Sequence, residues 1–356
     1  MDLNNLLYFY KGKKVLVTGH TGFKGSWLCE ILLMAGAEVY GYSLRPEEQS
    51  MFNLCKLEDN VHSRFADIRD FTELKAFFDF VKPDIVFHLA AQPIVLEGYK
   101  NPVETYGVNV MGTVNILDCL RLYSLPCSFV NITTDKVYLN REWEWGYREY
   151  ERLDGYDPYS NSKSCSELVT ATYKRSFFTS DSKIAISTAR AGNVIGGGDF
   201  AKDRIVPDCV RAAETKQPLI VRNPSSTRPY QHVLEPLFAY LLLAYKQSCN
   251  MNLAGSFNVG PGDEGCFSTL QIVETFKKYW GETFTWETLK TNSGAPHEAN
   301  FLRLDNTKIK SEIGWRPVWS LKETISSIVQ WHKAPVNDRQ DITQQQINAF
   351  IKASQI

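Results

Sequence analysis

Short apolar runs alternate with amphipathic stretches along the first half of the chain. Five runs with the character of β-strands lie at Lys14–Thr18, Glu38–Ser43, Val61–Ala66, Asp84–Ala90 and Ser128–Thr133. Stretches with helical periodicity lie at Trp27–Met34, Phe71–Val81, Val103–Tyr123 and Asp157–Phe178, and a sixth strand is expected at Ile184–Arg190. Strands that alternate with helices predict parallel βαβ units, and continuous apolar strands predict a sheet covered on both faces. We therefore expect an α/β fold with a doubly wound parallel sheet.

The pattern changes after Gly196, where Gly and Pro become frequent and the predicted strands become short. The elements expected here are helices at Val206–Glu214, Leu234–Lys246, Leu270–Tyr279 and Leu321–His332, and a strand at Ser256–Val259. We interpret residues 184–356 mainly as a smaller, mixed α/β lobe for a substrate, with some segments returning to the main sheet. The Gln-rich tail from Asp341 is compatible with a helix.

Composition and charge exclude several classes of protein. The 356 residues carry 39 Lys and Arg against 40 Asp and Glu, so the net charge is −1 and gives no general preference for nucleic acid or an anionic membrane. No run reaches the roughly 18 apolar residues of a membrane-spanning helix, and the N-terminus lacks the pattern of a secretory signal. The eight cysteines form no CxxC pair, so we expect reduced thiols in a cytoplasmic protein without a metal site.

A glycine-rich turn follows the first predicted strand. Gly19, Gly22 and Gly25 have the spacing G-x-x-G-x-x-G between a strand and a helix. Glycine permits positive φ and a close approach to the backbone, and the helix N-terminus offers free N–H groups to a pyrophosphate. Lys24 precedes the last glycine, unlike the lysine of a P-loop. The turn therefore predicts a dinucleotide site, and the alternative is a turn that binds no ligand.

With Thr18 before the turn, and with Tyr159 and Lys163 as a Y-x-x-x-K pair, residues 13–335 resemble the extended short-chain dehydrogenase/reductase family. The resemblance implies that residues 1–183 are mainly a Rossmann domain that binds NAD. The implied cofactor contacts are Gly19, Thr21, Gly22, Phe23, Lys24, Gly25, Ser43, Arg45, Asp67, Ile68, Leu89, Ala90, Ala91, Gln92, Asn109, Tyr159 and Lys163.

The end of the second predicted strand does not distinguish NAD from NADP. An acid at this position would favour the ribose 2′-hydroxyl of NAD. The chain has neutral Ser43, and Arg45 follows as either a contact for a 2′-phosphate or a solvated charge. The expectation of NAD therefore depends on the family resemblance.

Tyr159 and Lys163 lie four residues apart and share one face of a helix. A free tyrosine is a poor base at neutral pH, with a pKa of about 10. A nearby ammonium group stabilises the phenolate, so we expect Lys163 to lower the pKa of Tyr159. Tyr159 would then take a proton from a substrate hydroxyl. The alternative is an exposed helical Tyr and Lys without a catalytic role.

Two ionisable residues, Asp135 and Lys136, follow Thr134 at the end of the fifth predicted strand. Ligands bind at the carboxyl ends of strands in a doubly wound sheet. An elimination needs one group to remove a proton and another to protonate the leaving hydroxyl, and this pair supplies both. Thr134, Asp135, Lys136, Tyr159 and Lys163 are therefore the expected catalytic residues. A surface Asp-Lys at a strand end is the alternative.

Sugar-nucleotide 4,6-dehydratases, which are lyases, carry such a pair, and Asp-Lys resembles the branch that acts on CDP-glucose. Longer segments also resemble this branch: Asn140–Glu149, Asp157–Ser160, Arg190–Asp199 and Arg228–Val233. The resemblance implies oxidation at C4, loss of water across C5 and C6, and reduction at C6. It leaves open whether Lys136 is the base or stabilises an enolate.

A nucleotide sugar requires cations for its diphosphate, and arginines near turns of the second lobe can supply them. The expected substrate contacts are Gln92, Thr134, Asn193, Arg204, Ile205, Val206, Pro207, Arg222, Arg228, Asn258 and His297. For each arginine the alternative is a solvated surface charge, and for His297 it is a loop residue.

One segment departs from the resemblance. Ile94–Tyr99, interpreted as a loop near the sugar, contains Leu96-Glu97-Gly98 where the family has a basic residue and a Ser. This leaves open a dehydratase or epimerase for another nucleotide hexose, and an NAD-binding module without activity. The resemblance further implies a homodimer formed by the helices at 103–123 and 157–178, and a role in bacterial surface-polysaccharide synthesis.

Overall fold

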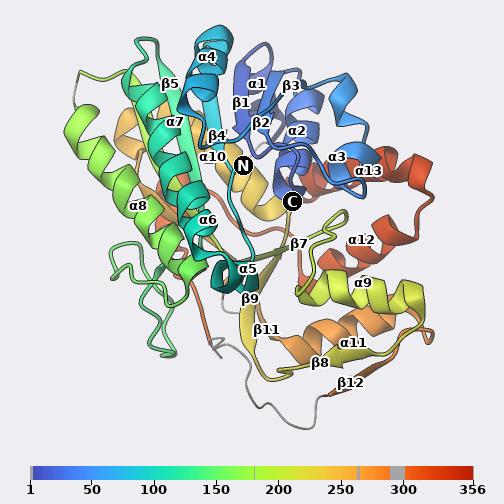
Figure 1. Ribbon diagram of the computed structural model, residues 1–356. Helices are drawn as coiled ribbons and strands as arrows, with labels where there is room; N and C mark the ends of the chain where they lie inside the picture. Colours follow the sequence, from blue (N-terminus) through green and yellow to red (C-terminus); the bar gives the residue numbers. More distant parts are fainter. Residues whose placement is uncertain (1–2, 180, 263–264, 289–300, 356) are drawn as a thin grey trace.

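A parallel sheet dominates the computed structural model, which describes residues 3–179, 181–262, 265–288 and 301–355 (Figure 1). Within these residues its seven strands are β1 (Lys14–Thr18), β2 (Glu38–Ser43), β3 (His62–Phe65), β4 (Ile85–His88), β5 (Cys127–Thr134), β6 (Ile184–Ala191) and β10 (Ser256–Val259). The order is β10-β6-β5-β4-β1-β2-β3, and every pair is parallel. The predicted doubly wound α/β sheet is confirmed.

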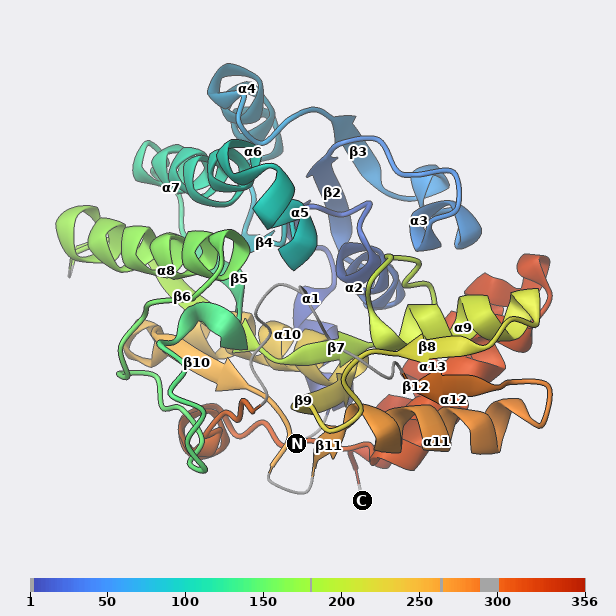
Figure 2. The same cartoon turned by 60° about the horizontal axis from the view of Figure 1, so that its bottom comes forward.

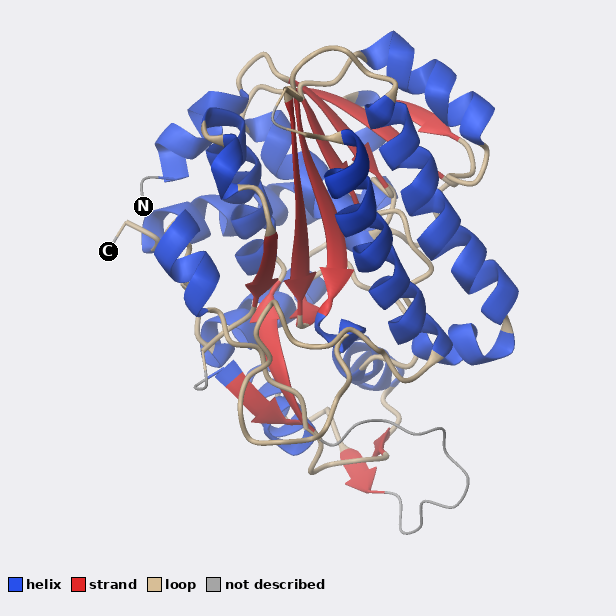
Figure 3. Cartoon of the chain, turned by 90° about the vertical axis from the view of Figure 1, so that its left-hand side faces the viewer, coloured by secondary structure: helices blue, strands red, loops and turns tan. Residues whose placement is uncertain are grey.

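Helices cover both faces of this sheet (Figure 3). One layer contains α4 (Phe71–Val81), α7 (Gly112–Arg121) and α8 (Pro158–Phe177), and the other contains α1 (Leu3–Tyr10), α2 (Phe23–Met34) and α10 (Leu234–Cys249). Successive residues of a strand face opposite layers. In β1, Val15 and Val17 pack in the core with α2 and α10, whereas Leu16 packs in the core with α4 and α7. None of the described helices is both long and apolar enough to cross a membrane.

A smaller lobe with its own core lies below the carboxyl ends of the strands (Figure 2). It contains β7 (Asn193–Ile195), β8 (Leu219–Val221), β9 (Thr227–His232), β11 (Cys266–Ser268), β12 (Trp286–Thr288), α9 (Ile205–Thr215), α11 (Thr269–Trp280) and α12 (Leu321–Lys333). Its strands form the small sheets β11-β9-β7 and β12-β8. β6 and β10 follow residue 183 in the chain but belong to the main sheet.

Several segments differ from the prediction made from the sequence. The stretch expected as one helix at Val103–Tyr123 consists of α6 (Pro102–Tyr106), the π-helical segment η2 (Gly107–Met111) and α7. The expected loop at Ile94–Tyr99 is largely the short helix α5 (Val95–Lys100). Helices α1 and α3 (Met51–Leu54) were not predicted, and the Gln-rich tail forms α13 (Arg339–Ala353). Periodicity gives a weak signal for short helices such as α1, α3 and α5.

Gly41 is required by the packing of His20 from the glycine-rich turn. A Cβ atom at position 41 would lie 2.2 Å from Cδ2 of the His20 ring, which is fully buried. The ring packs edge-on against Phe52, and its Nε2 lies 3.0 Å from Ser63 Oγ, so it has little freedom to move.

We expect Gly41→Ala to lower the free energy of unfolding by about 1–3 kcal/mol, because an added methyl group overpacks a closed core. Urea-induced unfolding measures this change. Gly107→Ala is the control, since its Cβ would lie 3.5 Å from Arg69 in a helical segment, and it should be neutral or stabilising by up to about 1 kcal/mol. Equal stabilities of the two variants would contradict this account.

Candidate active site

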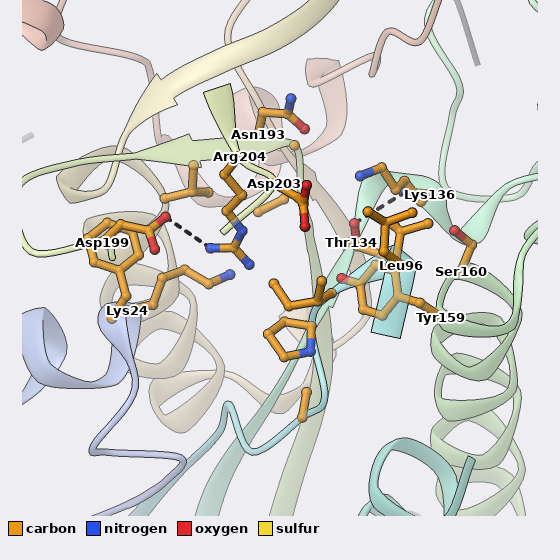
Figure 4. A pocket seen from close by; sticks show the side chains of 18 of the residues that line it. Lys24, Leu96, Thr134, Lys136, Tyr159, Ser160, Asn193, Asp199, Asp203 and Arg204 are labelled. Carbon is orange, nitrogen blue, oxygen red and sulfur yellow. Dashed lines mark hydrogen bonds and ion pairs between the residues drawn. The ribbon is translucent and has the colours of Figure 1, made fainter. Parts of the chain in front are cut away.

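A cavity of about 1160 Å³ separates the carboxyl ends of the central strands from the smaller lobe. A pocket for one drug-sized ligand has about 300–1000 Å³, so this cavity is larger than a typical site for a single small ligand. In Figure 4, Lys24, Asp199 and Arg204 lie on one side of it, and Thr134, Lys136 and Tyr159 lie on the other.

Most of the residues predicted from the sequence line this cavity. They are Gly19, Thr21, Gly22, Phe23, Lys24, Gly25, Ser43, Asp67, Ile68, Leu89, Ala90, Ala91, Thr134, Lys136, Tyr159, Asn193, Arg204, Ile205, Val206, Pro207, Arg222 and Arg228. Residues from distant parts of the sequence therefore meet at one edge of the sheet, as expected for a doubly wound fold.

The glycine-rich turn is closed against the neighbouring backbone. Gly19 has a φ of +74°, and a Cβ there would lie 2.7 Å from the nitrogen of Ala90. A Cβ at Gly25 would lie 2.1 Å from the carbonyl oxygen of Gly19. Gly22 caps α2 without a side-chain hydrogen bond, so the first N–H groups of α2 are available to an anion.

The end of β2 presents neutral hydroxyl groups to the cavity. Ser43 Oγ lies 2.8 Å from Thr21 Oγ1, which donates to the carbonyl of Leu44 at 3.0 Å. Arg45 does not line the cavity, since its guanidinium group lies 4.8 Å from the ring centroid of Phe65. At the end of β2, the cavity is therefore lined by the neutral residues Ser43 and Leu44, and not by the charged Arg45.

Tyr159 is positioned by the start of α8. Asp157 caps this helix by accepting hydrogen bonds from the Ser160 backbone N–H at 3.0 Å and from Ser160 Oγ at 2.5 Å. Burial raises the pKa of Tyr159 to about 12, although a hydrogen bond with Thr134 and the charge of Arg204 oppose the increase. The expectation of a lowered pKa is therefore wrong, because desolvation of the phenol outweighs the nearby charges.

Lys163 lies behind Tyr159 and does not line the cavity. Its Nζ donates to the carbonyl of Ile132 at 3.3 Å, and the residue is 5% exposed. Burial lowers the pKa of Lys163 to about 8, and the negative charge of Glu167 opposes this decrease. Lys163 therefore carries a positive charge over most of its population at neutral pH.

Asp135 and Lys136 form the short 3-10 turn η3 (Asp135–Val137), which Thr134 caps. Lys136 lines the cavity, whereas Asp135 is 1% exposed and lies behind its wall. Asp135 Oδ1 accepts from Thr134 Oγ1 at 3.0 Å, and Oδ2 has no hydrogen-bond partner in the described part of the chain. Burial raises the pKa of Asp135 above its ordinary range, although Lys136, the Thr134 hydrogen bond and Arg228 oppose the increase.

Positive groups gather on the side of the cavity that faces the smaller lobe. Arg204 forms an ion pair with the buried Asp199 at 3.0 Å, and Arg228 is 3% exposed. Burial lowers the pKa of Lys24 to about 7, and the charges of Lys163 and Arg204 lower it further. Such a cluster stabilises a diphosphate, which would in turn favour the charged form of Lys24.

Besides Arg45, Asp135 and Lys163, four more predicted residues lie away from the cavity wall or outside the described residues. Gln92 and Asn109 hydrogen-bond each other, with Gln92 N 2.8 Å from Asn109 Oδ1, and neither lines the cavity. Asn258 is fully buried, and its side chain bonds Tyr138 and the carbonyls of Tyr147 and Asp305. His297 lies outside the residues that the structure describes.

Other cavity residues were missed by the sequence analysis. Asp199 was quoted only as part of a matching segment, yet its carboxylate holds Arg204. Leu96, from the segment interpreted as a loop near the sugar, lines the cavity from the helix α5. The contact of Gly98 with α8 was not predicted: a Cβ there would lie 3.1 Å from the nitrogen of Tyr159. The sequence offered one signal for Asp199, which lies five residues before Arg204, a predicted substrate contact. No periodicity in the sequence indicated the helix α5.

Comparisons with known proteins agree with this geometry. A family model described as GDP-mannose 4,6 dehydratase matches residues 16–328. A CDP-glucose 4,6-dehydratase from Salmonella typhimurium is 48% identical over 332 residues, which cover 92% of each chain. Among solved structures, a UDP-glucuronic acid 4-epimerase from Bacillus cereus, in complex with UDP-glucuronic acid and NAD, has a TM-score of 0.77 at 22% identity and covers 90% of this chain and 98% of its own. A dTDP-glucose 4,6-dehydratase from Bacillus anthracis, in complex with NAD, has a TM-score of 0.74 at 19% identity, with 90% and 96% covered.

Asp135 is expected to destabilise the folded chain at neutral pH. Because its pKa is raised in the folded state, the folded chain binds the proton more tightly than the unfolded chain does. Its contribution to stability is therefore lost as pH rises through the folded-state pKa. Asparagine does not ionise, so Asp135→Asn should raise the free energy of unfolding at neutral pH and raise it less at acidic pH.

Urea-induced unfolding at both pH values measures this difference. Asp79→Asn, at an exposed position of α4, is the control and should change stability by no more than about 0.5 kcal/mol at either pH. A loss of stability in Asp135→Asn at neutral pH would contradict the assigned effect of burial.

Proposed function

Because the chain belongs to the GDP-mannose 4,6-dehydratase family, we propose that it is an NAD-dependent lyase that converts CDP-glucose to CDP-4-keto-6-deoxyglucose. The single observation that carries this proposal is the position of Asp135 and Lys136, directly after Thr134 and at the same cavity as Tyr159. The 48% identity to a CDP-glucose 4,6-dehydratase supports the choice of nucleotide and sugar.

The residues around the glycine-rich turn fit NAD. The tight backbone at Gly19 and Gly25 leaves a concave surface at the start of α2, where the uncapped N–H groups suit a pyrophosphate. Asp67 and Ile68 line the region expected for adenine, and the hydroxyls of Thr21 and Ser43 are available to a ribose. When bound, NAD would accept the C4 hydride of the sugar and later return it to C6.

Tyr159 is the proposed base for the C4 hydroxyl. Its hydroxyl is bonded to Thr134, so the two side chains can share the proton that leaves the sugar. The high pKa of Tyr159 without ligands means that positive charge must stabilise the phenolate during the reaction. Lys163, which is mostly charged at neutral pH, and Arg204 are the protein groups proposed to provide it.

Asp135 is the proposed acid for the elimination. A carboxyl whose pKa is raised by burial keeps its proton to a higher pH than an exposed carboxyl, which suits it to protonate a departing C6 hydroxyl. Lys136 either removes the C5 proton or stabilises the enolate that the 4-ketone forms. In this step the C5–H and C6–O bonds break, a C5–C6 double bond forms, and water leaves.

The smaller lobe is proposed to hold the nucleotide. Arg204, Arg222 and Arg228 line the cavity and can neutralise a diphosphate. On the sugar side, Leu96 of α5 narrows the cavity without adding a charge. In this proposal, the protein contacts the sugar of CDP-glucose without the basic residue that the family carries in the segment of α5.

We expect the purified protein with NAD to remove one water molecule from CDP-glucose, with no net formation of NADH. Product mass after incubation with CDP-, UDP-, GDP- and dTDP-hexoses measures this. Water loss from another nucleotide sugar would retain the mechanism and change the substrate. An unchanged mass with an altered NMR spectrum would instead indicate an epimerase, and no reaction with any sugar would contradict the proposed activity.

We also propose a homodimer formed by the helices on one side of the sheet, in which α8 lies next to α7 and α6. Large apolar side chains are exposed here: Val103 is 86% exposed, Met111 51% and Leu168 53%. Exposed apolar side chains on neighbouring helices mark protein interfaces.

The eight cysteines form no disulfide in this structure, and we propose a cytoplasmic location, where thiols remain reduced.

Sedimentation at micromolar concentration should show a dimer for the wild-type chain. The double variant Met111→Glu/Leu168→Glu should be monomeric, because two charges would be buried in the interface. Tyr8→Glu is the matched control, since Tyr8 is 75% exposed on α1 in the other helix layer, and it should remain dimeric. A monomeric wild-type chain would contradict the proposed dimer.

A further inference from the structure

A buried ion pair lies behind the acid–base segment of the cavity. We propose that Glu167 and Arg190 position η3, and with it Asp135 and Lys136, by holding the chain on both sides of this turn. The inference rests on the proposed dehydration, because it concerns the groups that carry out the elimination. Neither Glu167 nor Arg190 lines the cavity, so they are positioning residues.

Glu167 holds the chain before η3. It follows Tyr159 and Lys163 at four-residue intervals on α8, so the three side chains share one helix face. Glu167 Oε1 accepts from Thr133 Oγ1 at 2.5 Å, and Thr133 directly precedes Thr134. The end of β5 is thereby fixed to the helix that carries Tyr159.

Arg190 holds the chain after η3. Its guanidinium donates to Glu167 Oε2 at 2.8 Å and to the hydroxyl of Tyr138 at 2.7 Å. It also lies 5.1 Å from the ring centroid of Tyr138, the first residue after η3. One buried pair therefore fixes both ends of a three-residue turn.

The surrounding bonds keep the pair in a single arrangement. The side chains of Arg190 and Glu167 are 3% and 2% exposed, and Thr188 Oγ1 donates to Glu167 Oε2 at 2.7 Å. Tyr138 Oη donates to Asn258 Oδ1 at 2.7 Å, which explains why Asn258 is turned away from the cavity. Arg190 Nε has no hydrogen-bond partner in the described part of the chain, but both carboxylate oxygens of Glu167 and the two terminal nitrogens of Arg190 are bonded. A buried ion pair is poor evidence for net stability, but one held by several hydrogen bonds can specify one geometry.

The geometry assigns these residues to the elimination in particular. η3 carries the groups for the C5 and C6 positions, whereas Tyr159 is fixed independently by the Asp157 cap of α8. Loosening η3 should therefore slow the loss of water more than the oxidation at C4. A displacement of about 1 Å can reduce a rate by about 100-fold.

The test uses Thr133→Val and Glu167→Gln in the full-length protein with NAD and CDP-glucose. We expect kcat to fall by about 10- to 100-fold with KM unchanged. Because oxidation at C4 continues while elimination is slow, reduced nicotinamide should accumulate during turnover of Thr133→Val, which the wild-type chain does not show. Glu167→Gln also removes the negative charge that favours charged Lys163, so its oxidation step should slow as well and less reduced nicotinamide should accumulate. Thr133→Val leaves both charges of the pair in place, so it remains informative if Glu167→Gln does not fold. Asp79→Asn, which breaks an exposed ion pair on α4, is the control and should behave as wild type.

Amide hydrogen exchange at residues 134–138 is the second measurement, and it should be faster in both variants than in the wild-type chain. The inference would be overturned if Thr133→Val kept the kcat of the wild-type chain. It would also be overturned if kcat fell while no reduced nicotinamide accumulated and amide exchange at residues 134–138 was no faster. If the wild-type chain removes no water from CDP-glucose, the proposed function fails, and the exchange at 134–138 alone decides whether the pair positions η3.

Discussion

The parallel ladder between β5 and β6 is the interaction on which the site depends. It pairs eight residues of each strand, from Cys127 with Ile184 to Thr134 with Ala191. Because the two strands end together, the reactive turn η3 and the crossover into the smaller lobe leave the sheet side by side. A Cβ at Gly192, just past Ala191, would lie 3.4 Å from the unbonded Oδ2 of Asp135. The ladder therefore sets where Asp135, Lys136 and the smaller lobe meet.

Burial shifts the pKa values of four ionisable groups at this site toward their neutral forms. The pKa of Tyr159 and of Asp135 is raised, and the pKa of Lys24 and of Lys163 is lowered. Desolvation is the largest cause of each shift. A charged ligand in the cavity would change these pKa values again. A site in which acids retain protons and amines lose them readily is suited to proton transfer near neutral pH. The same desolvation of charged groups opposes folding.

The sequence predicted the main sheet because its strands are continuous and apolar, and it located most of the cavity because parallel strands end at one edge. It failed where short helices carry little periodicity, as in α5, and where a residue in a matching segment faces the core, as Asn258 does. It also gave the wrong direction for the pKa of Tyr159, since spacing reveals the Lys163 charge but not the extent of burial. Glu167 was visible as the next residue on the face of Tyr159 and Lys163, but its partners come from β5 and β6.

Helix α13 lies beyond residues 16–328, the part of the chain that the family model matches. Gln344 Nε2 of this helix donates to Glu30 on α2 at 2.6 Å, and Trp331 of α12 donates to Thr343 Oγ1 at 2.9 Å. Phe350 stacks on Phe238 of α10 with ring centroids 5.1 Å apart. One helix thus joins the helices that cover the main sheet to the smaller lobe. A hinge motion that separated the two would have to break these contacts, so α13 opposes such a motion.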